Sequence, residues 1–177
     1  MSKQVCAIGV VAVLVSCWTA DTQAQAAFQL SLFNPVQIVD EQETVAGVSL
    51  GLFYTVNSSM TGFNSSLVVN KVTGDVTGMQ EGLVNLIDGR VTGVQSGLFN
   101  DVGRDFSGWQ NGLINRNRGP LTRGVQIGLL NLSGEFRGFQ MGIMNIADNL
   151  YGIQLGLVNL NNSGEPFRFL PIVNWSF

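Results

Sequence analysis

A single short motif recurs along almost the whole chain, and this repetition constrains the fold more strongly than any other feature. The segment 78–85 reads Gly-Met-Gln-Glu-Gly-Leu-Val-Asn, and the segment 93–100 reads Gly-Val-Gln-Ser-Gly-Leu-Phe-Asn. Further copies occupy 108–115, 124–131, 138–145 and 152–159, looser copies begin at Gly47 and Gly62, and degenerate copies lie at 27–34 and 171–174. Successive first glycines from Gly47 onward are 14 to 16 residues apart. The chain is therefore built from about ten copies of one structural unit.

Each copy has the composition of a β-strand followed by a turn. Its two glycines argue against a helix, where each would cost roughly 1 kcal/mol relative to alanine. The apolar positions are rich in Val, Ile, Leu and Phe, and the variable stretches carry turn signals such as Asp88-Gly89 and Ser133-Gly134. Charged residues make up only 12% of the chain. Between the first glycine and the final Asn of the copies we find only Glu81 and Arg168, so the strands carry almost no charge on either face.

Two all-β architectures fit such a repeat. In a β-solenoid, each copy of about 15 residues forms one coil, and identical positions stack about 4.8 Å apart. In a ten-stranded antiparallel outer-membrane β-barrel, each copy forms one membrane-crossing strand. An even number of copies, the uncharged strands and the ending 175–177 (Trp-Ser-Phe) favour the barrel, because this ending is similar to the assembly signal of outer-membrane barrels.

Three features favour the solenoid, which is the fold we expect. The apolar positions break strict alternation, so a straight strand would present apolar groups on both of its faces. Pro171 falls within the last copy, where a closed barrel needs a backbone donor. Glu81, Ser96 and Asn111 occupy a position that would face lipid in a barrel.

In a solenoid the invariant amides become two side-chain ladders, which hold the coils in register. The predicted glutamine ladder is Gln80, Gln95, Gln110, Gln126, Gln140 and Gln154. The predicted asparagine ladder is Asn85, Asn100, Asn115, Asn131, Asn145 and Asn159. Phe99, Trp109 and Phe139 suggest a sugar-binding stripe, but their positions are apolar in every copy, so we expect them to pack in the core.

The N-terminus reads as an export signal. Lys3 precedes an almost wholly apolar run, 5–15, that is too short for a membrane-spanning helix of roughly 20 residues. Ala24-Gln25-Ala26 fits ordinary signal peptidase. We therefore predict a signal peptide at 1–26 and a single β-repeat domain at 27–177.

A second form of processing remains open. Residues 14–17 (Leu-Val-Ser-Cys) match a lipoprotein box, in which Cys17 would be acylated and become the first residue of the mature chain. The only other cysteine, Cys6, is removed in both cases, so we expect no disulfide. Either route predicts an exported protein at the outer membrane or the cell surface, with the periplasm as the alternative.

Both ends of the chain carry distinctive segments: 29–36 reads Gln-Leu-Ser-Leu-Phe-Asn-Pro-Val, and 169–177 reads Phe-Leu-Pro-Ile-Val-Asn-Trp-Ser-Phe. Together with the repeats, they resemble a bacterial family known as surface repeat-containing proteins, found in spirochaetes and other diderm bacteria. The resemblance covers essentially all of the chain after the signal peptide. It implies export and an envelope or surface location, and it supplies no catalytic residues. The copy at Gly62 departs from the pattern, with Asn64 in place of Gln and Ser66 in place of Gly.

The composition argues against an enzyme. The chain has no histidine to activate a hydroxyl nucleophile, and its two cysteines lie within the first 17 residues. The acidic run at Asp40, Glu41 and Glu43 reads as a solvated loop, so we expect no metal and no cofactor. The net charge of −3 and the scattered cations argue against nucleic acid as a partner.

We therefore expect a non-enzymatic exported envelope or surface repeat protein with a structural or partner-binding role. Its partner would be an unidentified envelope component or the membrane. The alternative is a small integral outer-membrane barrel that serves as a pore. Arg116, Arg118 and Arg123 form a local basic cluster in the sequence, which we interpret as a solvated turn rather than a site for anionic lipid head groups.

Overall fold

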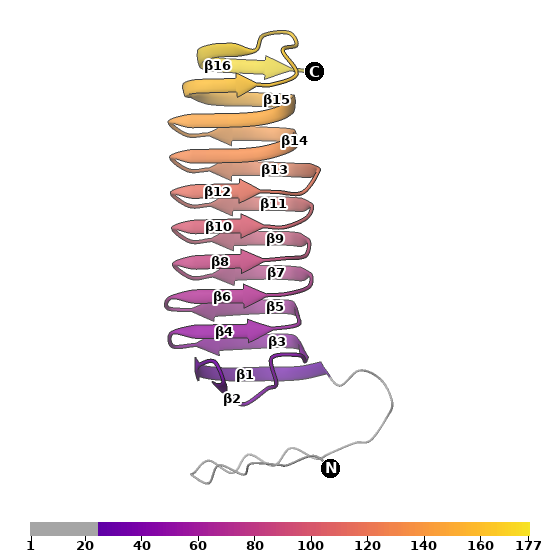
Figure 1. Cartoon of the computed structure of the whole chain (residues 1–177), viewed down its shortest axis with the longest axis vertical. Coiled ribbons are helices and arrows are strands. Elements are labelled where there is room, and N and C mark those ends of the chain that lie inside the picture. Colours follow the sequence, from indigo (N-terminus) through magenta and orange to yellow (C-terminus); the bar gives the residue numbers. More distant parts are fainter. Residues whose placement is uncertain (1–24) are drawn as a thin grey trace.

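The computed structural model describes residues 25–177 of the chain. This part winds into an all-β solenoid of about 9 coils, each of about 15 residues (Figure 1). Neighbouring coils are parallel and in register, with Gly93 opposite Gly78 and Gln95 opposite Gln80. The solenoid prediction is confirmed, and the alternative of an antiparallel barrel is wrong, because consecutive repeats lie side by side in the same direction.

One side of the solenoid is a parallel sheet that we call the glutamine sheet. Its strands are β1 (Gln25–Phe33), β3 (Thr44–Gly51), β5 (Ser59–Ser66), β7 (Val76–Glu81), β9 (Val91–Ser96), β11 (Phe106–Asn111) and β13 (Leu121–Ile127). They stack in that order along the axis.

The other side is a second parallel sheet, the asparagine sheet. Its strands are β4 (Tyr54–Asn57), β6 (Val69–Val72), β8 (Val84–Ile87), β10 (Phe99–Val102) and β12 (Ile114–Asn117). β14 (Leu130–Met141) and β15 (Met144–Asn161) run without interruption from this sheet into the glutamine sheet, so each belongs to both.

The second glycine of each repeat lets the chain turn from one sheet to the other. At Gly97, a Cβ atom would lie 2.7 Å from Nδ2 of Asn85, so no side chain fits there. The first glycine meets a different restriction. Gly93 has φ 135°, a conformation that side-chain-bearing residues rarely adopt.

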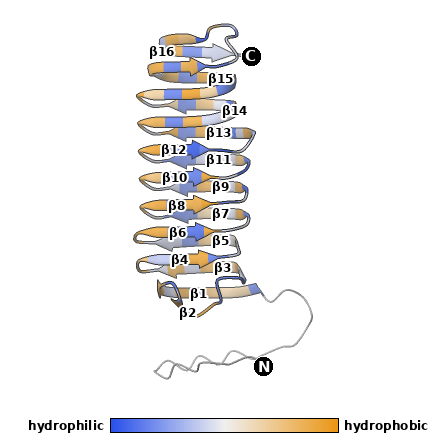
Figure 2. Cartoon of the chain, in the orientation of Figure 1, coloured by the Kyte–Doolittle hydropathy of each residue, from blue (hydrophilic) through white to orange (hydrophobic). Residues whose placement is uncertain are grey.

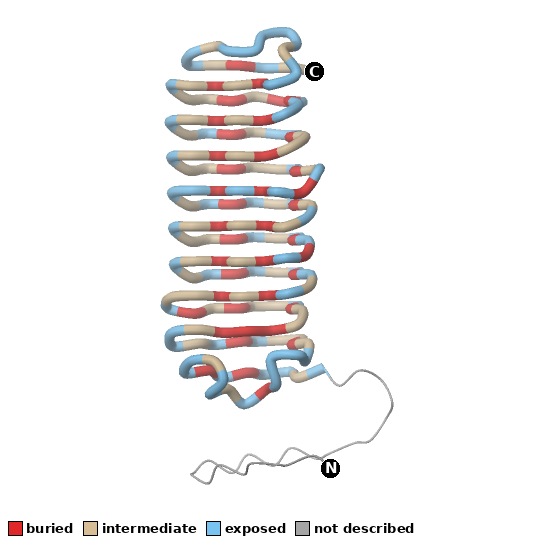
Figure 3. Tube along the Cα trace, viewed as in Figure 1, coloured by how far each residue is buried: buried red, intermediate tan, exposed pale blue. Residues whose placement is uncertain are grey.

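Buried positions recur in register from coil to coil (Figure 3), and the side chains at these positions form two chemical zones in the interior. At the edge where the variable turns lie, fully buried apolar side chains such as Val91, Val102 and Phe106 form the core. At the opposite edge the buried side chains are the amides of the repeat, and Gln95 and Asn100 have no exposed surface. Among the described residues, polar side chains therefore outnumber apolar ones in the interior, and a buried polar group needs a hydrogen-bond partner.

Short antiparallel strands cover both ends of the stack. β2 (Val36–Gln37) pairs with β1, and β16 (Phe169–Ser176) pairs with β15. The degenerate copy at 27–34 lies within the solenoid, with Gln29 opposite Ser49. The copy at 171–174 does not form a tenth coil: it runs antiparallel, and Asn174 lies opposite Gln154. Because Pro171 lacks an N–H and Ile172 has φ 72°, this segment departs from a regular strand.

Residues 1–24, which contain Cys17 and most of the predicted signal peptide, lie outside the described residues. The first strand begins at Gln25, so it includes Gln25 and Ala26 of the predicted signal peptide. Among residues 25–177, no helix is long and apolar enough to cross a membrane.

Candidate interaction surface

The glutamine side chains of consecutive coils form one hydrogen-bonded column inside the solenoid. Gln95 donates from Nε2 to Oε1 of Gln80 at 3.0 Å, and Gln110 donates in the same way to Gln95 at 2.7 Å. The column continues through Gln126, Gln140 and Gln154 at donor–acceptor distances of 2.7 to 2.8 Å. Each glutamine of this column is completely buried, so the ladder is part of the core.

The asparagines form a second buried column on the facing sheet. Asn85 donates from Nδ2 to Oδ1 of Asn100 at 2.8 Å, and Asn100 donates to Asn115 at 2.9 Å. The other hydrogen of the Asn100 amide goes to the backbone carbonyl of Asn111 at 2.9 Å. The column runs from Asn70, which the sequence-based ladder omitted, to Asn159. These ladders join coil to coil and leave no amide facing solvent, so they stabilise the fold and offer no ligand site.

The two ladders have opposite hydrogen-bond directions. In the glutamine column, each residue donates to the preceding coil, as Gln110 does to Gln95. In the asparagine column, each residue donates to the following coil, as Asn85 does to Asn100. The second donor of each of these asparagines fixes its orientation, because it reaches a backbone carbonyl at 2.6 to 3.0 Å.

The apolar residues beside these amides point outward. Strand geometry sends neighbouring side chains to opposite faces, so the inward Gln110 places Trp109 on the surface, where 48% of it is exposed. Phe139 lies in the same outward column of the glutamine sheet, whereas Phe99 faces outward from the asparagine sheet. The expectation that Phe99, Trp109 and Phe139 pack in the core is wrong, and they do not form one stripe either.

The edge where the chain turns from the glutamine sheet to the asparagine sheet carries one large aliphatic residue in each coil. We call this row the leucine edge. It consists of Leu32, Leu52, Leu67, Leu83, Leu98, Leu113, Leu129, Ile143 and Leu157. Their exposed fractions lie between 42% and 67%. Figure 2 shows this row as a hydrophobic border along the left side of the solenoid.

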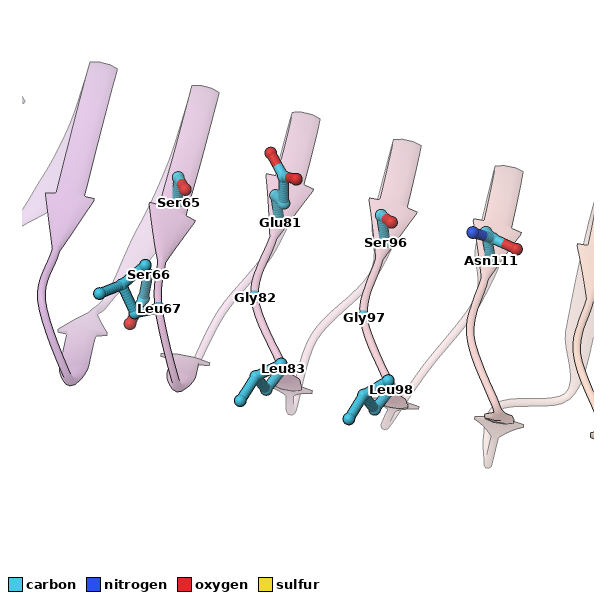
Figure 4. Close-up of a pocket in the computed structure, with 10 residues that line it drawn as sticks. All are labelled: Ser65, Ser66, Leu67, Glu81, Gly82, Leu83, Ser96, Gly97, Leu98 and Asn111. Atoms are coloured by element: carbon cyan, nitrogen blue, oxygen red, sulfur yellow. The ribbon is translucent and has the colours of Figure 1, made fainter.

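A shallow groove follows the leucine edge on the side of the glutamine sheet. Its floor consists of glycines such as Gly82 and Gly97, and one stretch has a volume of about 400 Å³. Figure 4 shows Leu67, Leu83 and Leu98 projecting outward on one side of it. The opposite wall in this stretch is polar, with Ser65, Glu81, Ser96 and Asn111. The groove continues past the next coils, where Ile127 and Met141 make this wall apolar.

The opposite edge of the solenoid carries charge. Arg118 contacts Asp101 at 3.1 Å and Asp88 at 3.9 Å, and Lys71 contacts Asp88 at 2.6 Å. These ion pairs are partly exposed and each contributes little to stability. The structure separates the predicted basic cluster, because Arg116 lies on the asparagine sheet and Arg123 on the glutamine sheet, and both are exposed.

Within residues 25–177, His, Cys, Asp and Glu form no group of three or more that is placed to hold a metal ion.

Comparison with models of protein families, with curated proteins and with solved structures finds no match. The fold and surface therefore define the chain as a β-solenoid repeat protein with two internal amide ladders and one continuous apolar edge.

Proposed function

We propose that this chain is an exported, non-enzymatic protein of the bacterial envelope that serves as a structural or partner-binding scaffold. The observation that carries the proposal is the regular exterior: each coil presents the leucine edge at the same place, and the charged turns at the other edge. A stack of like coils provides an extended surface for contact rather than an enclosed pocket. The apolar run at 5–15 and the Ala24-Gln25-Ala26 sequence support export.

The location is the outer membrane or the cell surface, with the periplasm as the alternative. The resemblance of the repeats and chain ends to surface repeat-containing proteins supports the same compartments. Ordinary cleavage before Ala27 is the processing that we favour, and acylation of Cys17 is the alternative.

Fractionation of a diderm host expressing the full chain tests export. We expect a shortened product in the envelope fraction and accumulation of the full-length chain in the cytoplasm when Leu14→Arg interrupts the apolar run. Incorporation of labelled palmitate that is abolished by Cys17→Ser would identify the lipoprotein route. Equal cytoplasmic retention of the parent and the Leu14→Arg variant would overturn the proposal of export.

A further inference from the structure

The leucine edge is apolar along its whole length, and one of its flanks is apolar as well. On the asparagine sheet, the outward column next to the edge contains Tyr54, Val69, Val84, Phe99, Ile114, Leu130, Met144 and Val158. Most of these residues are half-buried and Ile114 is exposed. Charges appear only in the next column on this face, at Lys71, Asp101 and Arg116.

The other flank limits the apolar surface. On the glutamine sheet, the column next to the edge is polar in the middle coils, at Ser65, Glu81, Ser96 and Asn111. It is apolar toward both ends, at Leu50 and Met141 for example. The apolar band therefore covers the leucine edge and extends onto the asparagine sheet. On the glutamine sheet the polar column interrupts it in the middle coils, and a separate outward apolar column that includes Met79, Val94 and Trp109 lies beyond.

We infer that the leucine edge lies in the interfacial layer of a lipid bilayer, with the solenoid axis parallel to the membrane surface. Amphipathic elements that bind in this way place their apolar side about 5–10 Å into the boundary between head groups and acyl chains. In this solenoid the leucine edge itself carries no charge, and the ion-paired residues lie farther from it, at the variable turns and in the more distant column of the asparagine sheet. With the leucine edge immersed, the ion pairs of Arg118 and Lys71 remain in water.

Two features favour lipid over a second copy of the chain. The leucine edge is a convex corner, and two convex corners meet along a line and bury little surface, whereas a fluid bilayer surrounds the corner. The row is also nearly uniform, since Ile143 alone departs from leucine, so it offers no feature that would fix the register of a protein partner. A fluid apolar phase requires no register.

Under the alternative processing route, the chain that precedes β1 favours the same partner, because Cys17 would carry acyl chains. Cleavage before Ala27 removes this segment, and the edge is then the membrane contact on its own. If Cys17 is acylated, the acyl chains are attached eight residues before Gln25, a distance of at most about 28 Å in extended chain. Acylation of Cys17 rests on the proposed function, whereas the apolar character of the leucine edge does not depend on it.

The net charge of −3 predicts how the binding responds to salt and lipid. A negatively charged protein gains nothing overall from anionic head groups, so apolar burial is the driving force. We expect binding to neutral phosphatidylcholine vesicles, with little loss when the salt concentration rises. Binding that requires anionic lipid and disappears in high salt would assign the contact to Arg116 and Arg123 and overturn the role of the edge.

Vesicle sedimentation with the full chain measures the contribution of the edge. The test variant replaces Leu83, Leu98 and Leu113 with Ser. The matched control replaces Met79, Val94 and Trp109 with Ser, because these residues lie in the same coils, are exposed to a similar extent (37% to 48%) and project from the glutamine sheet. We expect the edge variant to bind at least about tenfold more weakly and the control to bind like the parent. Equal losses in both variants would overturn the inference.

A depth measurement reports on the edge directly, because replacing Trp18 leaves no tryptophan fluorescence from residues 1–24. All variants carry Trp18→Phe, Trp109→Phe and Trp175→Phe, and a single tryptophan is placed by Leu98→Trp or Val94→Trp. Brominated phosphatidylcholine should quench the first tryptophan strongly and the second weakly, with circular dichroism confirming the β structure of both. Equal quenching overturns the proposed orientation.

Two other outcomes have separate meanings. A dimer that forms without lipid and is lost in the Leu→Ser variant would assign the edge to a second copy of the chain. Failure of export would contradict the proposed function but would leave the vesicle-binding result unchanged.

Discussion

Asn64 and Gln80 occupy adjacent positions in the same buried column, yet no hydrogen bond joins their side chains. Nε2 of Gln80 has no partner, and neither do Oδ1 and Nδ2 of Asn64. In the next coil, the glutamine pair Gln80 and Gln95 is joined at 3.0 Å. Asparagine is one methylene shorter than glutamine, so the glutamine ladder stops at the copy where the sequence departs from the repeat.

The first prediction is that Asn64→Gln stabilises the protein. The longer side chain brings an acceptor to Nε2 of Gln80 and should add about 1 kcal/mol to the free energy of unfolding, the typical net value of a hydrogen bond. Chemical denaturation followed by circular dichroism measures the change. Asn64→Met is the control for side-chain length without an amide. If Asn64→Met stabilises as much as Asn64→Gln, the gain comes from packing and the explanation is wrong.

The second prediction concerns the asparagine ladder. Asn100→Leu leaves an Nδ2 hydrogen of Asn85 without an acceptor and Oδ1 of Asn115 without a donor, whereas the carbonyl of Asn111 keeps the backbone N–H of Gly97. Each of the two buried groups costs about 1–3 kcal/mol, so we expect a loss of at least about 2 kcal/mol. The control is Leu98→Asn, which changes an exposed side chain two residues away and should alter the stability by less than about 0.5 kcal/mol. Similar melting temperatures for the two variants would contradict a structural role of the ladder.

The third prediction tests the first glycine of the repeat. Gly93→Ala forces a side chain into φ 135° and brings its Cβ against the backbone of Gly78, whose carbonyl carbon would lie at 2.9 Å. We expect a loss of more than about 2 kcal/mol. Gly134→Ala is the comparison variant, because Gly134 does not have a positive φ and a Cβ there approaches the carbonyl oxygen of Gly119 less closely, at 3.0 Å, so its loss should be smaller. A Gly93→Ala variant as stable as this comparison variant would refute the packing argument.

The fourth prediction is that one whole middle coil is dispensable. Deleting 91–105 joins Arg90 to Phe106, and Phe106 already occupies the same column as Val91. The remaining coils keep their register, so the shortened chain should fold with a modest decrease in melting temperature. Deleting only β9, residues 91–96, shifts the amides out of their columns and should abolish the β signal in circular dichroism. Unfolding of both deletions would argue against independent coils.

The fifth prediction addresses the C-terminal end of the stack. Removing 167–177 takes away β16 and exposes the backbone groups of β15 that pair with it, from Gly152 to Leu160. An uncovered strand edge recruits other chains. We therefore expect the truncated protein to associate in a concentration-dependent manner in analytical ultracentrifugation, while the parent does not. A truncated protein that stays in the association state of the parent would show that β16 does not protect this edge.

The stacking direction could be predicted because the repeat places the same amide at the same position in each coil. The side chains of Gln80 and Gln95 can form a hydrogen bond only if their strands are neighbours in register. An antiparallel arrangement of consecutive repeats does not place them side by side. The end of the stack was less predictable. The segment 171–174 resembles the other copies, but it lacks the two glycines and contains Pro171, so it folds back on β15.

The sidedness of the apolar residues was not recognised from the sequence, although a signal for it is present. Hydrophobicity alone does not distinguish an inward valine from an outward tryptophan, and Val91 and Trp109 are both apolar positions of the repeat. Alternation around the buried Gln110 places Trp109 outside, since neighbouring residues of a strand face opposite ways. Where an amide is invariant and its neighbours are apolar, the amide is the better guide to the interior of a narrow solenoid.

The opposed directions of the two ladders also have an electrical consequence. An amide column in which every member points the same way along the axis accumulates a dipole as coils are added, in the manner of the peptide dipoles of a helix. Here the glutamine dipoles and the asparagine dipoles point in opposite senses, since Gln110 donates backward to Gln95 and Asn85 donates forward to Asn100. Their fields largely cancel, so the buried amides place little net charge separation between the two ends, whatever the number of coils.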